Sequence, residues 1–128
     1  MGVAENKAVV RRIMDEVING KALGAADDLY SAEHELHPAV PAIGRGPDGM
    51  KEAFAGLHDQ YPDVHVTIES MVAEEDVVAV RLTYTGTDAA TGQRATWPEV
   101  VFTRVADGRA VESWEIIDTG RSPDSAPW

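Results

Sequence analysis

The stretch 64-VHVTIES-70 is where the chain changes from a helical to a stranded pattern. Its apolar residues Val64, Val66 and Ile68 alternate with polar ones, and a period of two indicates a strand with one packed and one wet face. Further stretches of strand type follow, so the second half of the chain predicts an antiparallel meander. These stretches are residues 77–87, 95–105 and 110–118.

Upstream of residue 64 the apolar residues recur every three or four positions instead. This spacing predicts an amphipathic helix from Ala4 to Asn19, a short helix over 25–33 and a third helix over 47–61, which Pro47 suits as a first residue. Helices followed by a meander predict one α+β domain over residues 1–128, with the helices packed on one face of a curved sheet. Residues 119–128 are expected to form a flexible tail.

Composition narrows the classes of partner. The chain has 22 acidic and 11 basic residues, a formal net charge of -11, which argues against nucleic acid or an anionic membrane as partner. It has no cysteine, which excludes disulfides and thiolate metal sites. No segment approaches the roughly 20 apolar residues of a membrane span. We therefore expect a cytoplasmic protein that acts on a small molecule.

The last predicted strand carries the pattern D-G-x-x-V-E-x-W-x-x-x-D, from Asp107 to Asp118. With "LYSAEHELHP", "GPDGMKEAFAGL" and "YPDVHVTIE" before it, the chain resembles the SnoaL-like polyketide cyclase family. That family belongs to the superfamily of ketosteroid isomerase, scytalone dehydratase and limonene epoxide hydrolase. The resemblance implies a cone-shaped α+β barrel whose curved, mostly antiparallel sheet wraps on the N-terminal helices. It also implies a hydrophobic substrate, no metal or organic cofactor, and a homodimer formed through the exposed sheet face.

Asp118 is the first candidate catalytic residue. The resemblance assigns it the acid/base role in an intramolecular aldol ring closure. If Asp118 faces the pocket, strand alternation places Trp114 and Ile116 on its side and turns Glu115 and Ile117 away. An apolar pocket would raise the pKa of its carboxyl, as a general acid requires. The alternative is an aspartate that caps the turn at "DTG".

Two histidines in "HELHP" give the second candidate. In an extended segment an offset of three places His34 and His37 on opposite faces, which argues against a zinc site. By resemblance to ketosteroid isomerase, His37 takes the place of the proton-abstracting aspartate of that enzyme, and a neutral imidazole there serves as base or hydrogen-bond donor. A histidine at the pocket rim, bonded to the backbone, is the equal alternative.

Glu99 is the third candidate. Alternation in 95–105 divides the strand into one face with Trp97, Glu99, Val101 and Thr103 and another with the residues between them. On the first face Glu99 would pair with Asp118, and repulsion between the two carboxylates would raise one pKa. A solvent-facing glutamate beside Pro98 is the alternative, and a bulge near this proline would change the parity.

Other side chains are candidates for contact with the substrate. Aromatic rings and one aliphatic side chain would form the pocket wall, although aromatic residues on a strand or helix are often plain core. Arg81 would orient a substrate oxygen or pair with a carboxylate. The candidate substrate-binding residues are Tyr30, Arg81, Trp97, Trp114 and Ile116.

Together these residues predict a cofactor-independent cyclase or isomerase that closes a ring in a polyketide-like substrate by acid/base catalysis, as in antibiotic biosynthesis. An epoxide hydrolase, or a cyclase that opens epoxides with paired carboxylates, is the alternative within enzymes. A non-catalytic ligand-binding or dimerisation module of the same fold is the alternative outside them.

Overall fold

The computed structural model describes residues 2–38 and 43–118. Helix α1 (Val3–Arg12) runs on as a π-helical segment, and a 3-10 turn leads to the short α2, with α3 following β1. The other elements are η1 (Ile13–Asn19), η2 (Leu23–Ala25), α2 (Ala26–Leu29), β1 (Tyr30–His37), α3 (Gly46–Gln60), β2 (His65–Glu74), β3 (Val77–Thr87), β4 (Arg94–Ala106) and β5 (Arg109–Ile117).

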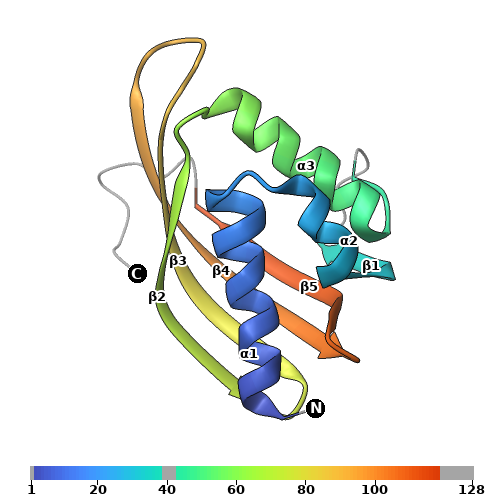
Figure 1. The fold of residues 1–128 in the computed structure, drawn as a ribbon. Helices are drawn as coiled ribbons and strands as arrows, with labels where there is room; N and C mark the ends of the chain where they lie inside the picture. The colour runs from blue at the N-terminus through green and yellow to red at the C-terminus, as the bar shows by residue number, and fades with distance from the viewer. Residues whose placement is uncertain (1, 39–42, 119–128) are drawn as a thin grey trace.

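The five strands form one sheet in the order β1-β5-β4-β3-β2. The pairs from β2 to β5 are antiparallel, whereas β1 runs parallel to β5. The sheet curves around α1, and α3 lies across its upper part (Figure 1). The predicted α+β class is confirmed, and the sheet stays open because β1 and β2 form its two edges.

The helices are held on the concave face by a core of aliphatic side chains. Val17 and Ile18 of η1 and Leu82 of β3 are fully buried in it. The side chain of Asn19 accepts a hydrogen bond from the backbone N–H of Val66 and donates one to its carbonyl oxygen, at 2.8 and 2.9 Å. These two bonds fix the end of the long helix against β2.

One element differs from the sequence expectation. The helix predicted over 25–33 ends at Leu29, and Tyr30–His37 is the parallel edge strand β1. Tyr30 pairs with Ala110 and His37 with Trp114, so β5 supplies the hydrogen bonds of this segment. Pairing with a distant strand overrides the local helical spacing.

The β4–β5 hairpin contains the irregularity that decides the face of every later residue in β5. Its two-residue turn has positive φ angles at Asp107 and Gly108, as predicted. Val105 pairs with Ala110, but Arg104 pairs with Glu112, so Val111 is an extra residue and forms a bulge.

Two further sequence expectations bear on the rest of the chain. No helix in residues 2–38 and 43–118 is both long and apolar enough to cross a membrane. The expected tail at 119–128 lies outside the described residues.

Candidate active site

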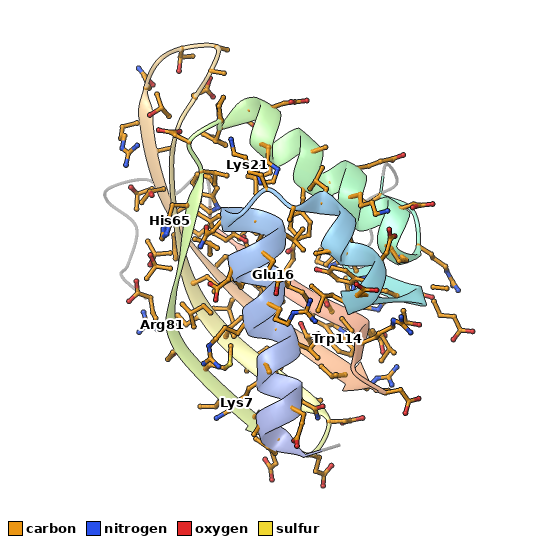
Figure 2. The ribbon with its side chains drawn as sticks, in the orientation of Figure 1. Lys7, Glu16, Lys21, His65, Arg81 and Trp114 are labelled. Atoms are coloured by element: carbon orange, nitrogen blue, oxygen red, sulfur yellow. The ribbon has the colours of Figure 1, made fainter. Side chains whose placement is uncertain are left out.

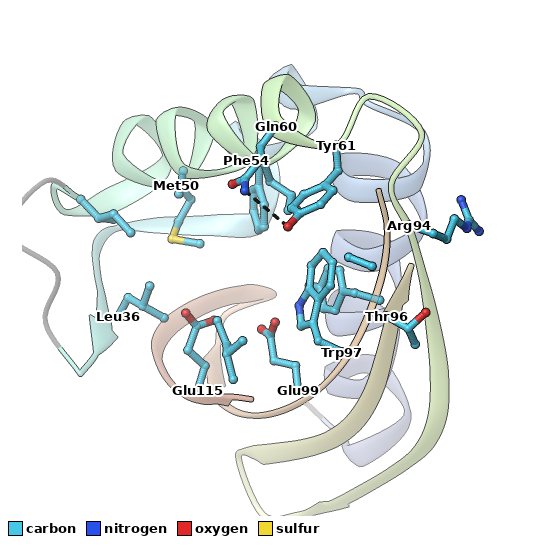
Figure 3. A pocket seen from close by; sticks show the side chains of 16 residues that line it. Leu36, Met50, Phe54, Gln60, Tyr61, Arg94, Thr96, Trp97, Glu99 and Glu115 are labelled. Carbon is cyan, nitrogen blue, oxygen red and sulfur yellow. Dashed lines mark hydrogen bonds between the residues drawn. The ribbon is translucent and has the colours of Figure 1, made fainter. Parts of the chain in front are cut away.

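A cavity of about 630 Å³ opens between α3 and the concave face of the sheet (Figure 3). Apolar side chains of α3 form its roof, aromatic rings form one end, and two carboxyl groups rise from the sheet. The described residues that line it are Leu36, Ile43, Met50, Ala53, Phe54, Leu57, Gln60, Tyr61, Tyr84, Arg94, Ala95, Thr96, Trp97, Glu99, Glu115 and Ile117.

Glu99 and Glu115 form a carboxyl pair on the floor of this cavity. Glu99 is only 6% exposed. Burial raises the pKa of Glu99 to about 9, with smaller contributions in the same direction from the negative charge of Glu115 and from a hydrogen bond between the two side chains. Burial also raises the pKa of Glu115, while the hydrogen bond with Glu99 opposes that rise. The negative charge of Glu115 acts on Glu99, so the shared proton belongs to Glu99 and Glu115 is the first of the pair to ionise.

The aromatic end of the cavity is built around Trp97. The Trp97 ring stacks on Tyr84, its cross-strand partner, with centroids 5.3 Å apart and planes 5° apart. Tyr61, which follows α3, lies against the same indole at 4.9 Å and 44°. The hydroxyl of Tyr61 accepts a hydrogen bond from the Gln60 amide. Packing of the three rings fixes the wall beside the carboxyl pair.

The predicted faces of β4 are confirmed. Trp97, Glu99, Val101 and Thr103 are all buried, and Phe102 is exposed. No bulge interrupts the pairing of β4 with β3, and pairing with β5 starts only at Glu99. The alternative of a solvent-facing Glu99 is therefore wrong.

The expected face of β5 is wrong. Glu115 and Ile117 line the cavity, and Ile117 is itself 44% exposed. Trp114 and Ile116 do not line it, and strand alternation turns both to the outer face of the sheet. The bulge at Val111 shifts the register by one residue, which turns each later side chain to the opposite face.

Two more of the expected substrate contacts lie elsewhere. Arg81 is exposed on the outer face of β3 and lies on the side of β2 away from α1 in Figure 2. Within residues 2–38 and 43–118 no ion pair involves it. Tyr30 is buried in the core and packs edge-on against His34, with ring centroids 4.7 Å apart. Neither residue lines the cavity.

Asp118 and His37 do not meet in the cavity, and neither lines it. Asp118 comes directly after the last residue of β5, and its backbone N–H donates to the Pro98 carbonyl at 3.3 Å. The His37 ring stacks on Trp114 and its Nε2 lies 2.8 Å from Glu112 Oε2. The catalytic roles assigned to Asp118 and His37 stay predictions.

His34 and His37 lie on opposite faces of β1, as predicted. His34 is 1% exposed and its Nε2 bonds Ser113 Oγ at 2.9 Å. Burial lowers its pKa to about 4, so the ring is neutral. The described part of the chain contains no cluster of three or more side chains placed to hold a metal ion.

Glu115 is the site residue that the sequence interpretation missed. It lies in "SWEII" between two apolar neighbours, a position that alternation counted from Asp118 assigns to the outer face. The pairing of Val101 with Glu115 across the hairpin is the signal that places it beside Glu99.

The sequence profile of SnoaL-like polyketide cyclases matches residues 8–121. The chain belongs to the SnoaL-like polyketide cyclase family. No curated protein sequence matches the chain.

Solved structures share the fold of this SnoaL-like protein. TsrD from Streptomyces laurentii matches with a TM-score of 0.83 and 21% identity, covering 92% of this chain and 91% of that one. AclR from Streptomyces galilaeus, named as a hydroxylase candidate, has 29% identity, a TM-score of 0.78 and coverages of 93% and 82%. IdmH from Streptomyces antibioticus, named as a polyketide cyclase candidate, has 23% identity, a TM-score of 0.78 and coverages of 88% and 91%.

Proposed function

We propose that this SnoaL-like protein is a cofactor-independent acid/base enzyme that enolises a polyketide-like substrate and closes it into a ring. The observation that carries the proposal is the hydrogen-bonded pair Glu99 and Glu115 on the floor of a mainly apolar cavity. One carboxyl that keeps its proton beside one that has lost it gives an acid and a base in the same place. Membership of the family supports the cyclase assignment.

The two carboxyls divide the work of the reaction. Glu115 removes a proton from a carbon next to a carbonyl, and the C–H electron pair moves to give an enolate. Glu99 donates a hydrogen bond to the enolate oxygen. The enolate carbon then attacks a second carbonyl carbon of the same substrate, and the new alkoxide takes the proton from Glu115. Both side chains return to their starting state, and the bent conformation is held by the walls of the cavity.

Opening of an epoxide is the second candidate function, because it also uses two carboxyls. Glu99 would protonate the epoxide oxygen, and Glu115 would deprotonate water or a substrate hydroxyl. A water between acid and base requires the two carboxyls to stand apart, as in inverting glycosidases. Here they bond each other directly, which favours enolisation.

A binding module without catalysis is the remaining alternative. A cavity of about 630 Å³ lies within the range of small-molecule sites, so binding alone does not separate the two functions. Turnover that depends on the carboxyl pair distinguishes an enzyme from a binding module.

Exchange of the α-protons of 2-tetralone for deuterium, followed by NMR, tests the proposal. Removal of a catalytic acid or base costs about 100-fold or more, and we expect that loss for Glu115→Gln and about tenfold for Glu99→Gln, whose amide still donates. Glu69→Gln on the exposed face of β2 is the matched control. Exchange that is lost in Asp118→Asn and kept in Glu115→Gln would return the role of base to Asp118. Diol formation from styrene oxide, without exchange, would favour the epoxide function.

A further inference from the structure

The indole N–H of Trp97 is a hydrogen-bond donor that the protein does not use. Among the described residues no side-chain or backbone acceptor bonds Trp97 Nε1. The N–H is also not sealed in the core, because the one buried side-chain polar atom without a partner in residues 2–38 and 43–118 is Asn6 Oδ1. Since Trp97 lines the cavity, its N–H is open to a ligand there.

The orientation of this donor is fixed. Tyr84 and Tyr61 hold the indole by the ring contacts described above. Figure 3 shows the nitrogen edge of Trp97 turned toward the interior of the cavity, on the side of the Glu99 carboxyl. A ring held between two others loses little conformational freedom when it donates to a ligand.

Trp97 and Glu99 are two residues apart on one face of β4, so both side chains project into the cavity from the same strand. The hydrogen bond between the carboxyls uses the proton of Glu99. Once Glu115 has taken the α-proton it no longer needs that bond, and the O–H of Glu99 becomes a second donor for a ligand oxygen. Glu115 supplies the negative charge beside them. Two donors and one base therefore converge in a space whose other walls are mostly apolar.

We propose that the Trp97 Nε1–H and the Glu99 carboxyl together bind one oxygen of a planar, conjugated ketone and hold it as the enolate oxygen while Glu115 takes the α-proton. The site is then specific for substrates whose charge is delocalised over a flat ring system, because Phe54 and Leu57 of α3 offer an apolar surface to that ring. Fixed donors aimed at an oxygen that gains charge are a common source of catalysis. The inference rests on the proposed enolisation and assigns its substrate class.

Binding of enolate analogues tests this assignment. In 2-naphthol the hydroxyl takes the place of the enolate oxygen, and 2-methylnaphthalene offers the same ring without a donor or acceptor. We expect Trp97→Phe to weaken 2-naphthol about tenfold, the scale of one lost hydrogen bond, and to leave 2-methylnaphthalene unchanged. Trp114→Phe, the matched change on the outer face, is expected to alter neither affinity. Calorimetric titration gives both constants.

A measurement on the wild-type protein tests the same donor without depending on whether the variant folds. The chain has three tryptophans, so their indole N–H signals separate readily in a ¹H–¹⁵N spectrum. We expect 2-naphthol, and not 2-methylnaphthalene, to move the Trp97 signal downfield. Equal shifts with both ligands, or equal losses of affinity in Trp97→Phe, would overturn the assignment.

The same experiments separate this inference from the proposed function. Loss of naphthol binding in Trp97→Phe without any ketone exchange by the wild type would leave the donor site standing and remove the enzyme. Exchange by the wild type with equal effects of Trp97→Phe on both ligands would keep the enzyme and remove the donor role.

Discussion

Replacement of Glu99 by glutamine isolates the energetic consequence of the buried carboxyl pair. A carboxyl whose pKa is higher in the folded than in the unfolded protein holds its proton more tightly when folded. Its contribution to stability is complete below the unfolded pKa and is lost as pH rises toward the folded pKa. For Glu99 that window runs from 4.5 to about 9. The wild type is therefore expected to lose stability across this range.

The magnitude follows from the size of the window. At about 1.4 kcal/mol per pH unit, the shift corresponds to a ceiling of about 6 kcal/mol. The cavity admits solvent to part of the carboxyl, which reduces the cost of ionisation, and we expect about half of this ceiling. Glutamine keeps the shape and donates to Glu115 at every pH. Glu99→Gln is then about as stable as the wild type at pH 5 and about 3 kcal/mol more stable at pH 8.

Urea unfolding at pH 5, 6, 7 and 8, followed by tryptophan fluorescence, measures the two stability curves. The exposed Glu69→Gln removes one negative charge from the same net charge of -11 and controls for long-range repulsion. Parallel curves for the wild type and Glu99→Gln would mean that the folded protein ionises Glu99 without cost. The acid role of Glu99 would then be untenable.

Two further changes test the walls of the cavity and the outer face of the sheet. An alanine at Gly86 would bring its Cβ to 2.9 Å from Tyr61 Cβ. Gly86→Ala is therefore expected to displace the Tyr61 ring and to lower the free energy of unfolding, measured in urea, by about 1–3 kcal/mol. The control Gly56→Ala has open space around its new Cβ and is expected to cost no stability. The homodimer implied by the family resemblance would use the exposed side chains of Phe102 and Trp114, which are direct cross-strand partners. Trp114→Glu is expected to give a monomer in light scattering. An unchanged dimer mass in that variant would place the interface elsewhere.

The sequence predicted β4 well because nothing interrupts its alternation. All eleven pairs from Val77–Arg104 to Thr87–Arg94 keep one register with β3, so a period of two read from the residues holds along the strand. The position of Glu99 among apolar residues on the inner face followed from this alone. Its burial did not, because a single glutamate in a strand is equally consistent with a solvated edge.

Edge strand β1 shows a different limit. The residues before Tyr30 have helical spacing, and the hydrogen bonds that make Tyr30–His37 extended come from β5, about 80 positions later in the chain. Parallel pairing of this kind leaves no turn signal in the sequence, because the two strands are not neighbours. The opposite faces of His34 and His37 were nevertheless predicted correctly, since they depend only on an extended backbone.

The orientation of Glu115, the proposed base of the carboxyl pair, depends on one extra residue in β5. A two-residue turn at Asp107-Gly108 with regular pairing would place Glu112 opposite Thr103 and turn each even-numbered residue of β5 inward. This is the arrangement expected when strand alternation is counted back from an inward-facing Asp118. With Val111 as a bulge, Ser113 stands opposite Thr103 instead, and Glu115 faces the cavity. Alternation counted along β5 carries no information about an unpaired residue, so the sequence located the strand and its acidic residues but not the carboxylate that meets Glu99.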